Sequence, residues 1–409
     1  MSALAQFLKS TGRRVEGSDR EASPTTELLE KTGIRVTIGH EQSIVPEGID
    51  LLIYSDAIWS DNPERIRAKA LKVPELSYFE ALGEATADGK TLAVTGVHGK
   101  TTTTGMLAAI LKAAGKEPTA VVGSIVRDWG SNYLPGREDL FVVEACEYRD
   151  HVLKLTPHIL VITNVEWDHT DYFPTVEALV ETFKKAAHAV PKDGAIVCDP
   201  AGPHVALALS GVKARIVDYT SADVPTLELL GEFNRDNARA AAAAARAAFP
   251  DIPDDTITDT LQSFKGSWRR FEHKGETPSG ALVYDDYAHH PTAMKKTIEA
   301  VREKFPDKKV IVAFHPHLYS RTKSLMDEFA DALCHADKAY VAPIYPAREA
   351  PDPCVSSEIL AERARKKGGD VAALDFDAIR RELLTEPPGS LIITMGAGDI
   401  YKVAEQIAD

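Results

Sequence analysis

Short apolar runs recur along the chain, and most of them are apolar at every position rather than at alternate positions. The continuous runs are LLIYS, TLAVTG, LFVVEA, ILVITN, AIVCD, KVIVAF, AYVAPI and SLIITMG, and the more broken ones are RVEGSD, RVTIGH and LVYDDY. Strands that are buried on both faces have this pattern, and such strands belong to parallel sheets covered by helices on both sides. The sequence therefore predicts parallel sheets.

Stretches with helical character lie between these runs. They include residues 63–72, 175–190 and 326–335, and the alanine-rich segment NRDNARAAAAAARAAFP, which ends at Pro250. Alanine has the highest helix propensity, so we expect a regular helix packed closely on a sheet. Strands that alternate with helices in this way predict an α/β fold built from several doubly wound units.

Two polar breaks divide the chain. Glu84–Lys90 and Glu272–Gly280 are rich in turn formers and poor in apolar residues, and each precedes a new strand. They predict a small N-terminal block, a central block and a C-terminal block. We place the boundaries at residues 1–88, 89–268 and 269–409.

Composition and charge narrow the class of protein. The chain has 409 residues, of which 44% are hydrophobic and 26% charged, values typical of folded globular domains. Its net charge of −14 disfavours a nucleic-acid partner. No run approaches the ~18 apolar residues of a membrane helix. The N-terminus has no secretory pattern, and four scattered cysteines suit a reducing compartment, so we expect a cytoplasmic protein.

The strongest local motif is TLAVTGVHGKTTTT at residues 91–104. A strand enters a turn with glycines at positions 96 and 99 and then a helix, so that backbone N–H groups and the helix N-terminus can face one anion. Lys100 can reach the outer phosphates of a nucleotide, and the Thr101 hydroxyl can ligate Mg²⁺. The turn is shorter than in the common GxxxxGK[ST] loop. We expect Lys100 to be a surface residue whose removal stops phosphoryl transfer and leaves the fold intact.

Acidic and imidazole groups follow two further strands of the same block. Glu144 ends the run LFVV, and ILVITN leads into Asn164–His169. Because ligands collect at the carboxyl ends of parallel strands, Glu144 and His169 are candidate Mg²⁺ ligands beside the phosphate loop. Alternatively, Glu144 forms a salt bridge and His169 is an ordinary loop histidine. Three further carboxylates of this stretch are expected to support the site indirectly or to be solvated, and not to ligate the metal: Glu166, Asp168 and Asp171.

Eight segments resemble the Mur ligases, in the same order and over nearly the whole chain. They are TGVHGKTTTT, VVEACEYRDH, ITNVEWDH, GEFNRDN, RRFE, DDYAHHPT, FHPHLYSRT and MGAGDIYK. The resemblance implies three α/β domains, each with a mainly parallel sheet flanked by helices. Rossmann-like N- and C-terminal domains would bind a UDP-sugar and an amino acid, on either side of a central P-loop ATPase domain.

The motifs are most similar to those of family members that act on UDP-N-acetylmuramate. The resemblance implies ATP-dependent ligation of L-alanine to its lactyl carboxylate through an acyl phosphate, in the synthesis of peptidoglycan precursors. Two alternatives stay open: a recycling ligase that adds a tripeptide to the same nucleotide-sugar, and a nucleotide-binding protein without ligase activity. The stretch FHPHLYSRT favours the single amino acid. A monomer and a homodimer are both compatible with the sequence.

The resemblance also implies roles for residues of the central block. Those that contact ATP are expected to be Gly96, His98, Gly99, Lys100, Thr101, Thr102, Asn234 and Asn237. The expected ligands of Mg²⁺ are Thr101, Glu144 and His169.

In the C-terminal block, the resemblance implies that Arg270 and Asp286 reach the nucleotide. His290 and Arg321 would orient the amino acid, with Arg321 facing its carboxylate. Without the resemblance, Arg269 and Arg270 would be interpreted as an exposed basic pair. The MGAGDI turn is interpreted as structural.

Several positions depart from the family pattern. The family begins with a strand and a GxxGxGMSxLA loop, whereas this sequence begins at Met1-Ser2-Ala3-Leu4-Ala5, so either the start codon lies further upstream or the sheet lacks a strand. Ser18-Asp19 matches a second strand end that contacts the nucleotide-sugar, and weaker candidates for that site are His40 and Ser55. Phe233 replaces a histidine, and Leu318 replaces an arginine found in some relatives.

Overall fold

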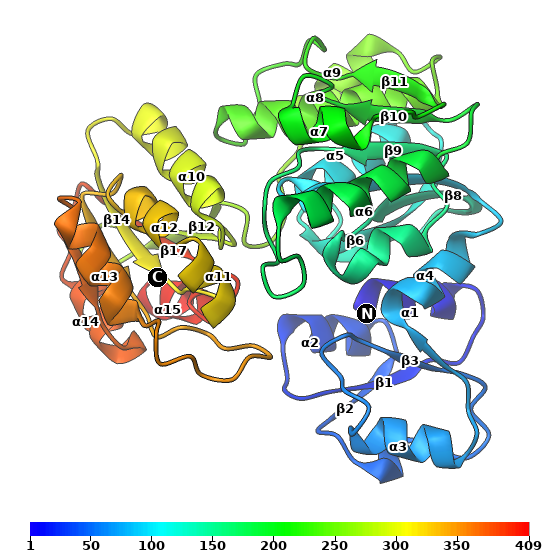
Figure 1. Cartoon of the computed structure of the whole chain (residues 1–409), viewed down its shortest axis with the longest axis horizontal. Helices are drawn as coiled ribbons and strands as arrows, with labels where there is room; N and C mark the ends of the chain where they lie inside the picture. Colours follow the sequence, from blue (N-terminus) through cyan, green and yellow to red (C-terminus); the bar gives the residue numbers. More distant parts are fainter. Residues whose placement is uncertain (409) are drawn as a thin grey trace. The chain divides into compact units, whose positions relative to one another are not determined.

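The computed structural model describes residues 1–408 (Figure 1). Contacts divide the chain into two compact units. Unit 1 comprises Met1–Glu166, Glu177–Thr226 and Asp236–Lys265, and unit 2 comprises Trp167–Val176, Leu227–Arg235 and the chain from Gly266 onward. Within residues 1–408, no helix combines the length and apolar character needed to span a bilayer.

The N-terminal part of unit 1 contains two separate pairs of parallel strands, β1-β2 and β3-β4. Its elements are α1 (Ser2–Ser10), β1 (Glu16–Asp19), α2 (Pro24–Lys31), β2 (Arg35–Ile38), η1 (Gln42–Ile44), β3 (Leu52–Tyr54), α3 (Pro63–Ala70), β4 (Glu75–Ser77) and α4 (Tyr78–Thr86). Ser23 and Ser77 form capping boxes that start α2 and α4.

The rest of unit 1 is built on a seven-stranded sheet with the order β11-β10-β9-β5-β8-β6-β7. Its strands are β5 (Lys90–Thr95), β6 (Pro118–Val126), β7 (Ser131–Leu134), β8 (Arg137–Glu144), β9 (Ile159–Ile162), β10 (Ala195–Cys198) and β11 (Arg215–Asp218). All neighbours are parallel except β6 and β7. The central strands are buried on both faces, as the continuous apolar runs predict.

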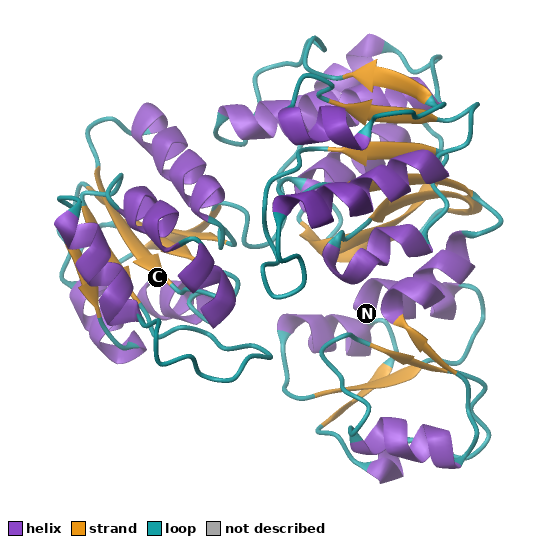
Figure 2. Cartoon of the chain, viewed as in Figure 1, coloured by secondary structure: helices purple, strands orange, loops and turns teal. Residues whose placement is uncertain are grey.

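Helices cover this sheet on both faces (Figure 2). They are α5 (Lys100–Ala113), α6 (Val176–Ala189), α7 (Pro203–Ala208), α8 (Glu232–Ala248) and α9 (Asp254–Ser263), with the 3₁₀ segment η2 (Tyr148–Lys154). Nearly all alanines of α8 are buried, which confirms the predicted close-packed helix. This helix begins in unit 2 and continues in unit 1 after Arg235.

Unit 2 contains a six-stranded sheet with the order β12-β13-β17-β14-β15-β16. Its strands are β12 (Glu272–Glu276), β13 (Leu282–Asp286), β14 (Lys309–Phe314), β15 (Lys338–Val341), β16 (Val371–Ala373) and β17 (Ser390–Met395). Its helices are α10 (Pro291–Lys304), α11 (Tyr319–Ser324), α12 (Met326–Leu333), α13 (Ser357–Lys366), α14 (Phe376–Leu384) and α15 (Tyr401–Ile407).

Two cores lie on opposite faces of this sheet. Val310, Val312 and Phe314 of β14 pack with residues of α10, α12 and α13. Ile311 and Ala313 of the same strand pack with α14 and α15. Successive side chains of a strand point to opposite faces, so a run that is apolar at every position fills both cores.

One sequence expectation is wrong at the start of this sheet. The polar stretch Glu272–Gly280 is not simply a break, because its first part is β12, which pairs antiparallel with β13. As an edge strand, β12 needs fewer apolar residues than a central strand. A composition-based search for linkers therefore mistakes it for one.

Candidate active site

The predicted phosphate loop joins β5 to α5, and two glycines shape it. Gly96 and Gly99 have φ angles of 124° and 83°, a region that side-chain-bearing residues rarely adopt. A Cβ on Gly96 would lie 2.1 Å from Thr163 Oγ1, and a Cβ on Gly99 would lie 2.1 Å from Asn237 Oδ1. Both glycines are therefore required by conformation and by packing, and the turn is as tight as predicted.

Side chains that follow β9 fix the backbone of this loop. The His98 amide donates to Asn164 Oδ1 at 2.9 Å, and Asn164 Nδ2 donates to the His98 carbonyl at 2.9 Å. The Thr163 hydroxyl donates to the same carbonyl at 2.6 Å, and His98 Nε2 lies 3.0 Å from Glu166 Oε2. The sequence prediction misses Asn164 as a site residue, although its place directly after an apolar strand was an available signal.

Lys100 is held by a carboxylate that the sequence prediction also misses. Its Nζ lies 3.1 and 2.9 Å from the two oxygens of Glu147, which is fully buried, and donates to the Val97 carbonyl at 3.2 Å. Burial alone would lower the pKa of Lys100, but the charge of Glu147 raises it above its usual value. The lysine side chain is only 14% exposed, so the expectation of a surface lysine is wrong.

The first turn of α5 also meets the predicted metal ligand of β8. The Thr101 hydroxyl donates to Glu144 Oε1 at 3.0 Å, and Gly123 N donates to Oε2 at 2.6 Å. Thr102, on the same turn, is buried. Carboxylate and hydroxyl oxygens are hard donors that suit Mg²⁺, so this pair fits the predicted cation.

The third predicted metal ligand, His169, belongs to unit 2. Its φ is 52°, and its backbone amide donates to Asp168 Oδ1 at 2.6 Å. Thr101 and Glu144 belong to unit 1. The joint ligand set of these three residues stays a prediction.

The two predicted adenine-side asparagines lie on α8. Asn234 and Asn237 are both buried and are three residues apart, so they share one face of the helix. Asn234 Nδ2 donates to the Leu230 carbonyl at 2.7 Å, and the Thr103 hydroxyl donates to Asn237 Oδ1 at 3.2 Å. Asn237 therefore contacts the helix that begins at the phosphate loop, and the roles of both residues toward a nucleotide stay predictions.

Two of the N-terminal candidates meet at one carboxylate. The Ser18 hydroxyl donates to Glu64 at 2.7 and 2.8 Å, and His40 Nδ1 lies 2.7 Å from Glu64 Oε1. Glu64 lies in the first turn of α3 and was missed as a site residue. Asp19 and Ser55 have local contacts: Glu21 N donates to the Asp19 carboxylate at 3.4 Å, and Ala57 N to the Ser55 hydroxyl at 3.3 Å.

In unit 2, the structure brings Arg270 and Asp286 together. The Asp286 carboxylate accepts from Ala288 N at 2.7 Å and from Phe271 N at 3.1 Å. Burial raises the pKa of Asp286 to about 6, although the nearby charge of Arg270 opposes the shift. The guanidinium carbon of Arg270 lies 4.8 Å from the centre of the Tyr287 ring. Their proximity fits a shared role, and their contact with a nucleotide stays a prediction.

The neighbouring Arg269 is a buried structural residue, so its interpretation as part of an exposed basic pair is wrong. Its Nε donates to Asp285 at 2.7 Å, and these side chains are 4% and 1% exposed. Its Nη1 and Nη2 donate to the carbonyls of Gly398 and Gly396 at 3.0 and 2.6 Å. Arg269 thus ties the MGAGDI turn to β13, in agreement with the structural interpretation of that turn.

His290 occupies the N-cap of α10. Its Nδ1 accepts from Thr292 N at 3.3 Å, and its Nε2 lies 3.2 Å from the Trp167 carbonyl. Because Nδ1 is the acceptor, the ring proton belongs on Nε2, which donates to Trp167. The histidine therefore starts the helix and holds the chain at Trp167, and its predicted part in orienting an amino acid stays a prediction.

Arg321 lies on α11 in a set of buried polar groups. Its Nε donates to Asp168 Oδ1 at 2.7 Å, and its Nη1 lies 3.3 Å from His317 Nδ1. Burial alone would raise the pKa of Asp168, but Arg321 and neighbouring imidazoles hold it well below its ordinary value. Asp168, expected from the sequence to be an indirect support or a solvated group, is the direct partner of a predicted site residue.

Two uncharged imidazoles accompany this pair. Burial, followed by the charge of Arg321, lowers the pKa of His317 to about 3 and holds that of His289 well below its usual value. The His317 ring stacks on Tyr345 with centroids 5.4 Å apart. Leu318, the departure from the family pattern, is buried with φ of 72°, and its amide donates to the Tyr345 carbonyl at 2.9 Å.

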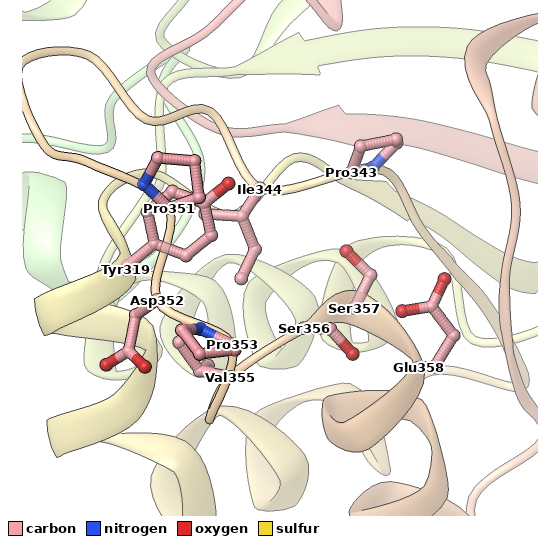
Figure 3. A pocket seen from close by; sticks show the side chains of 10 residues that line it. All are labelled: Tyr319, Pro343, Ile344, Pro351, Asp352, Pro353, Val355, Ser356, Ser357 and Glu358. Atoms are coloured by element: carbon pink, nitrogen blue, oxygen red, sulfur yellow. The ribbon is translucent and has the colours of Figure 1, made fainter.

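A cavity of about 510 Å³ lies elsewhere in unit 2 (Figure 3). Tyr319 and the loop after β15 form one part of its wall, and the start of α13 forms another. Its lining residues are Tyr319, Pro343, Ile344, Pro351, Asp352, Pro353, Val355, Ser356, Ser357 and Glu358. All of them lie outside the set of predicted site residues.

Comparison with family models gives three matches along the chain. They are described as Mur ligase family, catalytic domain (residues 1–90), Mur ligase middle domain (residues 94–224) and Mur ligase, glutamate ligase domain (residues 269–398). Together they span both units and include the phosphate loop.

Two curated relatives are similar over their full length. The UDP-N-acetylmuramate–L-alanine ligase of Caldicellulosiruptor saccharolyticus is 38% identical, over 100% of this chain and 96% of the relative. The enzyme of that name from Clostridium kluyveri is 37% identical, over 99% of this chain and 94% of the relative.

Solved structures show the same architecture. The UDP-N-acetylmuramate-alanine ligase of Thermotoga maritima matches with a TM-score of 0.81 and 25% identity, over 100% of this chain and 95% of that one. A murein peptide ligase from Psychrobacter arcticus matches in fold, with a TM-score of 0.76 and 23% identity over the same shares. The predicted three-domain α/β architecture with mostly parallel sheets is confirmed. This chain belongs to the Mur ligase family.

Proposed function

We propose that this protein is an ATP-dependent ligase that joins L-alanine to the lactyl carboxylate of UDP-N-acetylmuramate. The observation that carries the proposal is the full-length similarity to curated ligases of that name, 38% identical over 100% of the chain. The phosphate loop with Lys100, and the Thr101–Glu144 pair beside it, supply the chemistry that such a reaction needs.

The chemical difficulty is the activation of a carboxylate. A carboxylate is a poor electrophile at neutral pH, so transfer of the γ-phosphoryl group of ATP to one of its oxygens must first form an acyl phosphate and ADP. The amine of alanine then attacks the acyl carbon, and the tetrahedral intermediate loses phosphate and a proton to give the amide. Catalysis of phosphoryl transfer is mainly positioning and stabilisation of negative charge.

Lys100 supplies positive charge at the transferred phosphoryl group. In the structure its ammonium is bonded to Glu147 and to carbonyls of its own loop, and its raised pKa keeps it protonated. We propose that Lys100 exchanges part of these bonds for phosphate oxygens when ATP binds. The N-terminus of α5, which begins at Lys100, would complete the anion site.

Thr101 and Glu144 would hold Mg²⁺ through their oxygen atoms, with His169 as the further proposed ligand. When bound, the cation neutralises phosphate charge and orients the phosphoryl group. Asn237 packs against the turn at Gly99, and the Arg270–Asp286 pair would contact the nucleotide from unit 2. Arg321 would bind the carboxylate of alanine.

The test is ADP release by the purified protein with ATP, Mg²⁺ and UDP-N-acetylmuramate. L-alanine, glycine, L-serine and the recycling tripeptide are offered in parallel reactions, with an amine-free reaction as the control. The proposal expects the highest kcat/KM with L-alanine. Turnover with the tripeptide alone would instead support a recycling ligase. Binding of ATP without any amine-dependent turnover would support a nucleotide-binding protein.

A further inference from the structure

One short segment belongs to unit 2, although the chain on both sides of it belongs to unit 1. This segment, Trp167–Val176, is called the strap below. It follows β9 and the residues that fix the phosphate loop, and it precedes the body of α6. The side chain of Trp167 packs against the apolar core of unit 2. Polar and charged groups of the strap make further, directional contacts within that unit.

The central contact of the strap is the ion pair between Asp168 and Arg321. The two side chains are 3% and 2% exposed, and Nε lies 2.7 Å from Oδ1. Burying either charge alone would be costly, so each is retained because the other is present. Asp168 Oδ1 also accepts from the His169 amide at 2.6 Å, which fixes the direction of the carboxylate.

Further contacts hold α11 and the strap in register. The Thr170 hydroxyl donates to Ser320 Oγ of α11 at 3.4 Å. The His290 ring holds the start of the strap through the Trp167 carbonyl at 3.2 Å. Several independent contacts therefore fix the position of Asp168, and its carboxylate can hold the guanidinium of Arg321 in one orientation.

The pairing leaves one edge of that guanidinium available. Asp168 bonds Nε only, and Nη1 is 3.3 Å from His317 Nδ1. No residue that the structure describes bonds Nη2. A guanidinium is planar, so fixing Nε and Nη1 also fixes the direction of Nη2. The uncharged His317 accepts from Nη1 without adding a competing charge.

We propose that Asp168 is a positioning residue, which orients the Arg321 guanidinium so that its Nη2 edge receives the carboxylate of the amino-acid substrate. This inference rests on the proposed function, because it assumes that Arg321 binds that carboxylate. Asp168 acts through Arg321 and does not touch the substrate carboxylate. An arginine without this fixed partner would lose the alignment that a bidentate or directed contact requires.

The experiment measures steady-state kinetics of Asp168→Asn, Arg321→Lys and the double variant. Asp168→Asn keeps the shape of the side chain and removes its charge. It should raise the KM for L-alanine at least about tenfold, the usual size of a lost charge-assisted contact, while the KM for ATP stays within about twofold. In the Arg321→Lys background the same change should alter the alanine KM less than about twofold, because the planar fork is absent.

A matched control is available on the same strap. Asp171→Asn removes a carboxylate that pairs with Arg348 rather than with Arg321. It should leave the alanine KM within about twofold of the wild-type value. If Asp168→Asn does not fold, Asp168→Glu is measured instead, since it keeps the charge and displaces it by one methylene. It should raise the alanine KM and not the ATP KM.

Three results would overturn the inference: an unchanged alanine KM in Asp168→Asn, equal rises in both KM values, or the full effect in the Arg321→Lys background. Failure of the proposed function looks different. In that case the wild-type protein itself would show no alanine-dependent release of ADP, and the inference would fall with it.

Discussion

The ammonium of Lys100 lies 2.9 Å from the carboxylate of Glu147, and the Glu147 side chain has no exposed surface. The lysine of the phosphate loop thus has a buried counter-charge within the protein. This counter-charge keeps the lysine protonated and holds it near the turn. Its presence also makes both residues important for stability, which distinguishes this loop lysine from a solvated one.

Glu147→Gln should destabilise the protein when no nucleotide is present. The change removes one partner of a buried ion pair, which costs about 3 kcal/mol in the free energy of unfolding. Lys100→Met should cost a similar amount and also abolish ADP release. The double variant should regain much of the lost stability, because neither charge is left unpaired. Urea unfolding of the four proteins measures this, and an unaffected Glu147→Gln would show that the pair contributes nothing.

Glu144→Gln should weaken the use of Mg²⁺. Its carboxylate bonds the Thr101 hydroxyl, and loss of one ligand charge lowers cation affinity, here by at least about tenfold in the concentration that gives half-maximal activity. Glu138→Gln is the matched control, because Glu138 is an exposed carboxylate of the same strand. Equal Mg²⁺ requirements in both variants would remove Glu144 from the cation site.

Arg269→Ala should lower the stability of the protein, whereas Arg270→Ala should weaken its use of ATP. Arg269 pairs with Asp285 in the interior and bonds two carbonyls of the 396–398 turn, so its loss should cost about 3–5 kcal/mol of stability. Arg270→Ala should change the melting temperature little and raise the KM for ATP. Thermal unfolding and ATP kinetics on both variants separate the roles, and a large loss of stability in Arg270→Ala would contradict the assignment.

Asp286 should make stability depend on pH. An aspartate in an unfolded chain titrates near 3.9, whereas burial raises the native pKa of Asp286 to about 6. The native state therefore binds the proton more tightly, so this contribution to stability is complete below the unfolded pKa and is lost as pH rises through 6.

Asp286→Asn removes this titration. The variant should be more stable than the wild type by about 1–3 kcal/mol at pH 8 and equal to it near pH 4. Urea unfolding at both pH values measures the difference. A constant difference at the two values would show that Asp286 does not carry the shift.

The sequence predicts well whatever depends on local pattern. The strand β5, which leads into the phosphate loop, and its neighbour β9 are apolar along most of their length because both of their faces are buried. The turn between β5 and α5 requires glycines at positions 96 and 99. These constraints act within about ten residues, so they can be read along the chain. The alanine-rich helix can be predicted for the same reason.

The partners of the site residues could not be predicted in this way. Glu147 meets Lys100 across 47 positions, and Asp168 meets Arg321 across 153. Only the folded sheets bring these strand ends to their partners, and a carboxylate in a loop looks the same in sequence whether it is buried or solvated. The edge strand β12 was mistaken for a linker because it has little apolar surface to bury.

The central claim is that ATP activates the lactyl carboxylate as an acyl phosphate before alanine attacks. The most direct measurement uses UDP-N-acetylmuramate labelled with ¹⁸O in that carboxylate and follows the label by mass spectrometry of the released phosphate. We expect one labelled oxygen in the phosphate for each amide formed with L-alanine. Formation of the amide with unlabelled phosphate would contradict the account.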